Sequence, residues 1–95
     1  MIAANAARGE VVVTLAGTPR RLCLTLGALA ELETAFAVDG FAALAERLRT
    51  LSARDLAVVL AALLRGGGED AVDVSTIEFR EATQAVAAAF TAAAR

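Results

Sequence analysis

Aliphatic residues recur at every second position over residues 11–15 and 22–26, which is the period of a pleated strand with one buried face. Two strands are predicted in this way, over residues 10–16 and 20–26. Gly17-Thr18-Pro19 lies between them and predicts a turn, because glycine tolerates positive φ and proline fixes φ. The chain therefore begins with a predicted β-hairpin. The aliphatic residues on its buried face are Val11, Val13, Leu15, Leu22, Leu24 and Leu26.

After the hairpin, apolar residues recur at spacings of three and four, which predicts α-helices. The first helix begins at Thr25 or Gly27, and a short second helix covers residues 41–48. Ser52 is a good N-cap for a third helix, which the glycines 66–68 end. This third helix has the clearest apolar stripe of the chain, formed by Leu56, Val59, Leu60, Leu63 and Leu64.

A last helix is predicted over residues 75–94, after a possible flexible linker at 66–73. Ser75 and Glu78 match a capping box at its start. Its apolar face either packs on the rest of the domain or docks another chain, since helix-in-groove recognition needs only an apolar stripe and a complementary trough. Three side chains on this face are the candidate partner-binding residues: Phe79, Val86 and Phe90.

The length of 95 residues predicts a single domain over 1–95. The order of the elements predicts the α+β class, with an N-terminal β-hairpin packed on three to four α-helices. Aliphatic stripes exceed what so small a body can hide, so we expect self-association or binding to another protein.

Residue chemistry argues against an enzyme. The chain has no histidine, which removes the commonest general base and the commonest metal ligand. Its one cysteine, Cys23, has no histidine to activate it and cannot form an internal disulfide. The glycines 66–68 follow a helix and precede carboxylates, whereas a phosphate loop needs a strand before it and a helix after it. We expect no catalytic residue, no cofactor and no metal.

Two groups of acidic residues lack the arrangement of a catalytic or metal site. Glu31 and Glu33 are two residues apart, so on a helix they diverge and cannot act as a carboxylate pair. Glu69, Asp70 and Asp73 lack the ordered alternation and the distal glutamate of an EF-hand loop, which favours a solvated acidic loop.

The charge balance and the lengths of the apolar runs argue against nucleic acid and a membrane as partners. The formal net charge is −2, and the chain has no tyrosine or tryptophan, so a nucleic-acid surface is not expected despite Arg47, Arg49 and Arg54. The longest strongly apolar run, 56–64, is too short to cross a bilayer. No secretory signal is visible and one cysteine suits a reducing compartment, so the expected location is the cytoplasm.

The order of these segments resembles a known family. A hairpin of the form R-G-E-V-x-V-T-L-x-G precedes L-x-L-T-L-G-A-L-A-E-L-E, a D-G-F-A-A-L-A-E-R-L helix and an S-A-R-D-L-x-x-V-L-x-A-L-L-R-G-G-G helix. These segments are similar to the small tail proteins of phages, prophages and gene transfer agents, described both as tail tube proteins and as tail assembly chaperones. The matching ranges are 8–17, 22–33, 39–48 and 52–68.

The resemblance implies a role in building a phage-like tail. In related systems a small chaperone coats the helical, aggregation-prone tape measure protein until tube subunits polymerise around it. One hairpin offers little sheet for a tube wall, so the chaperone role is favoured and a structural tube component is the alternative. A small DNA-binding regulator is the third hypothesis. Tape measure or other tail proteins, and further copies of the chain, are the expected partners.

Overall fold

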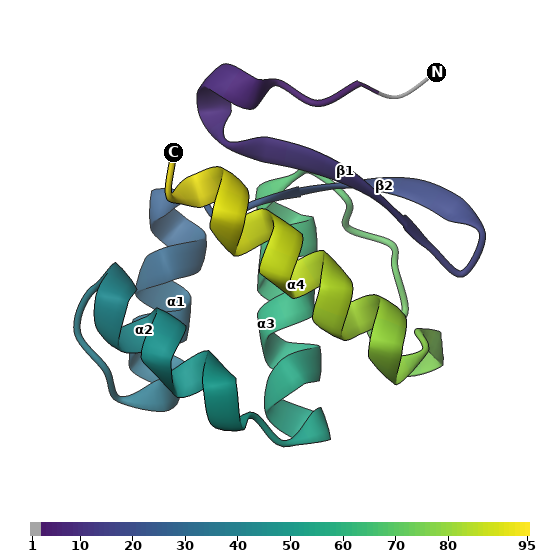
Figure 1. Cartoon of the computed structure of the whole chain (residues 1–95). Helices are drawn as coiled ribbons and strands as arrows, with labels where there is room; N and C mark the ends of the chain where they lie inside the picture. The colour runs from purple at the N-terminus through teal and green to yellow at the C-terminus, as the bar shows by residue number, and fades with distance from the viewer. Residues whose placement is uncertain (1–2) are drawn as a thin grey trace.

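The computed structural model describes residues 3–95, and it confirms the α+β class. A two-stranded antiparallel hairpin lies across one end of the helices, on α3 and α4, while α1 packs on the other flank of α3 and α2 packs on α1 (Figure 1). The elements are η1 (Ala6–Arg8), β1 (Glu10–Leu15), β2 (Thr18–Cys23), α1 (Leu26–Phe36), α2 (Phe41–Arg47), η2 (Leu48–Thr50), α3 (Ala53–Gly66), η3 (Val74–Thr76) and α4 (Phe79–Ala93).

The hairpin turn differs from the predicted Gly17-Thr18-Pro19 turn. Leu15 pairs with Thr18, so the loop consists of Ala16 and Gly17 alone. Both have positive φ, 52° and 82°, which defines a two-residue type I′ turn whose twist suits the strands. Pro19 instead lies within β2, opposite Thr14 in a pair that exchanges no backbone hydrogen bonds. The missing N–H of proline therefore removes no hydrogen bond from the sheet.

The second strand ends earlier than predicted. The alternation to Leu24 and Leu26 suggested a strand to residue 26, but β2 ends at Cys23. Thr25 has already begun α1 as its N-cap, and its hydroxyl oxygen accepts a 3.0 Å hydrogen bond from the Ala28 amide. Leu26 is therefore the first helical residue and is 84% exposed, where the pattern predicted a buried strand position.

Helix α3 is the centre of the core. As predicted, Ser52 caps it by accepting a 3.1 Å hydrogen bond from the Asp55 amide. Burial of its apolar stripe confirms the 3.6-residue period, because one face of the helix meets α1, α4 and the hairpin. The predicted stripe residues are all buried: Leu56, Val59, Leu60, Leu63 and Leu64.

The glycines at the end of α3 pack against the hairpin backbone. An added Cβ would lie 2.1 Å from the Cys23 carbonyl oxygen at Gly66 and 2.1 Å from the Arg21 carbonyl oxygen at Gly67. Glu69 follows directly and accepts a 3.0 Å hydrogen bond from the Arg21 amide. The predicted helix stop at 66–68 is confirmed, and these contacts fix its path along β2. The flexibility predicted for 66–73 stays a prediction.

The last helix begins at Phe79, four residues later than the predicted 75–94. Ser75 is not its N-cap, so the predicted capping box with Glu78 is wrong. The Asp73 carboxylate accepts hydrogen bonds from both the amide and the hydroxyl of Ser75, at 3.0 and 2.6 Å. These bonds hold Ser75 in the short helix η3, and the chain is extended again before α4 starts.

Candidate partner-binding groove

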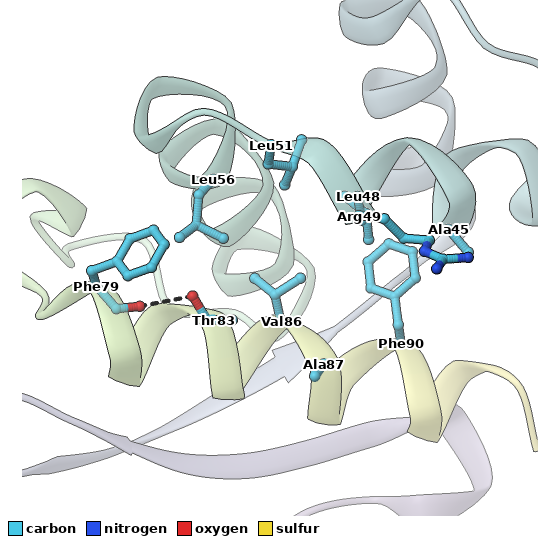
Figure 2. A pocket seen from close by; sticks show the side chains of 10 residues that line it. All are labelled: Ala45, Leu48, Arg49, Leu51, Leu56, Phe79, Thr83, Val86, Ala87 and Phe90. Atoms are coloured by element: carbon cyan, nitrogen blue, oxygen red, sulfur yellow. Dashed lines mark hydrogen bonds between the residues drawn. The ribbon is translucent and has the colours of Figure 1, made fainter.

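An apolar groove separates the end of α2 and η2 from α4, and the start of α3 closes it (Figure 2). Its volume is about 380 Å³. Five residues of α4 form one side, and residues from the other elements face them across the opening. The lining residues are Ala45, Leu48, Arg49, Leu51, Leu56, Phe79, Thr83, Val86, Ala87 and Phe90.

The three candidate partner-binding residues all line this groove, at different depths. Phe79 stands at one end of it and is 64% exposed. Val86 and Phe90 are buried, and the Phe90 ring stacks on Phe41 with centroids 5.5 Å apart. Figure 2 shows the three side chains along one face of α4, pointing toward the α2–η2 side. Phe79 is thus a rim residue, while Val86 and Phe90 form the floor. Their binding role stays a prediction.

A second hollow lies on the other side of Phe79 and Leu56, which line both. Its volume is about 320 Å³, and its walls come from α3, from α4 and from the segment that contains η3. The two hollows meet at Phe79 and Leu56, and together they are called the trough. Its further lining residues are Ala53, Arg54, Ala57, Leu60, Val74, Ser75, Ile77 and Ala82.

Sequence reasoning identified the α4 side of the groove and missed the opposite side. Leu48 and Leu51 are half-buried and face α4 across the opening. Leu48 is the last residue of the second helix predicted over 41–48, and Leu51 lies beyond that helix, so neither indicated a surface opposite α4; in the structure α2 ends at Arg47 and a 3-10 turn follows. Only the tertiary contact between segments about 35 residues apart makes them part of one surface.

Arginine side chains near the groove differ in their bonding. Arg47 makes a 3.0 Å ion pair with Asp55, and its guanidinium lies 5.3 Å from the Phe36 ring centroid. Arg49, at the groove, has only an exposed 3.5 Å contact with Glu46. Arg54, at the second hollow, makes no ion pair within residues 3–95.

Cys23 is buried beside the N-terminal turn. Its thiol donates a 3.4 Å hydrogen bond to the Arg8 carbonyl oxygen. Burial raises the pKa of the Cys23 thiol, with Arg8 opposing and Glu10 adding to the shift. A buried, protonated thiol is a poor nucleophile, so the geometry gives Cys23 a packing role.

The acidic residues serve separate structural contacts. Glu31 pairs with Arg65, and Glu33 accepts a hydrogen bond from the Gly40 amide, so these two carboxylates do diverge. Hydrogen bonds from Ser75 hold the pKa of the Asp73 carboxyl below its usual value. Across the part of the chain that the structure describes, acidic residues and cysteine form no cluster that could hold a metal ion.

None of the helices within residues 3–95 combines the length and apolar character that crossing a bilayer requires. Searches of curated proteins and of solved structures returned no match to this chain. The model of the family described as "Phage tail tube protein, GTA-gp10" matches residues 8–95. That range contains the hairpin, helices α1 to α4 and the whole groove, and it confirms the family resemblance read from the sequence. The chain therefore belongs to this tail protein family of phages and gene transfer agents.

Proposed function

We propose that this tail protein is an assembly chaperone that binds apolar helical segments of the tape measure protein in the groove beside α4. The groove carries the proposal. Its floor is the buried pair Val86 and Phe90, and its rim includes Phe79, a large aromatic side chain that is 64% exposed. An apolar trough with an exposed aromatic rim suits an amphipathic helix, whose apolar stripe would cover side chains that now face water.

The sheet supports the chaperone role over a role in the tube wall. The described residues contain one sheet, of two strands, and each strand has six residues. A tube wall built from strands needs a sheet that continues between subunits, and a lone hairpin on a helical body supplies little of it.

The alternative is a structural component of the tail tube, and the family description favours it, because that description reads "tail tube protein". The two roles differ in a measurable way. A chaperone acts before the particle is complete and is absent from it, whereas a tube component remains.

In either role the chain would bind other tail proteins and catalyse no reaction. The proposed location is the cytoplasm.

Co-expression with the tape measure protein of the same tail gene cluster tests the proposal. We expect the tagged chain to capture tape measure fragments, and Phe79→Ser to capture much less. Leu26→Ser is the matched control, because Leu26 is a large exposed aliphatic residue, 84% accessible, that does not line the groove. Circular dichroism of both variants establishes that they are folded.

Three results would count against the chaperone role. Failure to capture any tape measure fragment would remove its partner. Stable rings of the purified chain in electron micrographs, or the chain within finished particles, would favour the tube component. A salt-dependent shift of random duplex DNA would favour the third hypothesis, a DNA-binding regulator.

A further inference from the structure

The charged side chains that line the trough are all basic. Arg49 lines the groove and Arg54 lines the second hollow, and no aspartate or glutamate lines either. The remaining lining residues are aliphatic, aromatic or hydroxyl-bearing. A ligand that fills the trough with apolar side chains therefore meets positive charge at its edges.

These two arginines are available to a partner. The contact of Arg49 with Glu46 is 3.5 Å long and the two side chains are 75% and 74% exposed, so solvent screens it strongly. Arg54 is exposed and has no ion pair within residues 3–95. Arg47, by contrast, is held by Asp55 and by the Phe36 ring.

The length of the trough suits a short helix. Phe79 and Phe90 both line the groove and are eleven residues apart on α4, which corresponds to roughly 16 Å at 1.5 Å per residue. A partner helix lying along it would place about three turns there, with apolar anchors at positions i, i+3 or i+4, and i+7. Residues that flank such a stripe would lie beside Arg49, and where the helix passes Phe79 into the second hollow they would lie beside Arg54.

We propose that the trough selects amphipathic helices whose apolar stripe is flanked by aspartate or glutamate. The inference rests on the proposed function, since segments of the tape measure protein would be the source of such helices, and it adds the partner's charge pattern. Charge complementarity at a rim raises the association rate and rejects partners of the wrong sign, whereas the apolar floor supplies most of the affinity.

Two synthetic Ala-rich helices of equal length test the inference. Both carry leucine at i, i+3, i+4 and i+7, and one has glutamate while the other has lysine at the flanking positions. We expect the acidic helix to bind the full chain about tenfold more tightly at low salt, and the gap to narrow as salt is raised. Arg49→Glu and Arg54→Glu should each weaken the acidic helix and strengthen the basic one.

Arg95→Glu is the matched control, because Arg95 lies beyond the end of α4 and lines neither hollow, so it should keep the preference for the acidic helix. Equal affinity for both helices, or tighter binding of the basic one, would overturn the inference and leave the proposed function standing. If neither helix binds and tape measure fragments are also not captured, both proposals fail. A self-association that Phe79→Ser abolishes would show that a second copy occupies the trough, which also overturns the inference.

Discussion

The two ends of α3 contact their neighbours in opposite ways. At the C-terminal end, Gly66 and Gly67 lie so close to β2 that an added methyl group would overlap a carbonyl oxygen, at 2.1 Å in each case. At the N-terminal end, Leu56 faces Phe79 across a trough with a groove of about 380 Å³. The closed end fixes the hairpin on the helices, and the open end leaves the apolar groove accessible to solvent.

Side-chain size explains the difference. Glycine allows one backbone to approach another, and the hairpin joins α3 through such backbone contact. At the open end, bulky residues line the groove from both sides: Leu48 and Leu51 on one, and Phe79 and Phe90 on the other. A partner could thus enter the trough without moving the hairpin, so stability and binding should respond to different substitutions.

Gly67→Ala should have the largest effect on stability. The new Cβ would lie 2.1 Å from the Arg21 carbonyl oxygen, and neither a Cβ nor a backbone carbonyl can move away by a side-chain rotation. We expect a loss of about 3 kcal/mol or more, at or above the upper end of the usual cost of overpacking, measured by urea unfolding.

Gly27→Ala is the control for that change. Gly27 lies in the first turn of α1, and the nearest atom to an added Cβ is 3.9 Å away, an ordinary contact. Alanine favours helix over glycine, so this variant should gain up to about 1 kcal/mol. Similar losses in both variants would show that the close contact at Gly67 does not determine stability.

Val86→Ala, at the floor of the groove, should lower stability much more than Phe79→Ala, at its rim. Val86 is 5% exposed, and its loss of two methyl groups should cost about 2 kcal/mol through burial and cavity terms. Phe79 is mostly exposed, so its truncation should change stability by less than about 0.5 kcal/mol. Thermal melts and urea titrations of the two variants compare them directly. A loss of stability for Phe79→Ala as large as that for Val86→Ala would mean that the Phe79 side chain is buried in solution.

Features that depend on one segment could be predicted from the sequence, and features that depend on two could not. The buried stripe of α3 and its Ser52 cap follow from local spacing and were correct. Ser75 also has an N-cap pattern, but its amide and hydroxyl both donate hydrogen bonds to the Asp73 carboxylate, and α4 begins only at Phe79. The close approach of Gly67 to Arg21 and the Leu48–Leu51 wall arise from tertiary contact, which leaves no periodic signal in the sequence.

Glu69→Gln, at the end of α3 that contacts the hairpin, should lower stability less than Gly67→Ala or Val86→Ala. Glu69 contacts Arg20 at 3.3 Å and accepts a 3.0 Å hydrogen bond from the Arg21 amide, which covers the free edge of β2. An amide side chain keeps the acceptor and loses the ion pair, so we expect a loss of about 1 kcal/mol. Glu46→Gln, in the exposed pair with Arg49, should cost almost nothing. Equal losses from the two changes would contradict a special role for Glu69.

The smallest effect should come from the Cys23 thiol at alkaline pH. Burial raises the pKa of this thiol in the fold above its ordinary value of 9.0, so the folded state holds the proton more tightly than the unfolded chain. This stabilisation is complete below pH 9.0 and is lost as pH rises through the folded pKa. The chain has no lysine, tyrosine or histidine, so no other side chain titrates between about pH 8 and pH 11. Urea unfolding across that range should show a decline in stability that Cys23→Ala removes, and a decline that persists in Cys23→Ala would assign the effect to another group.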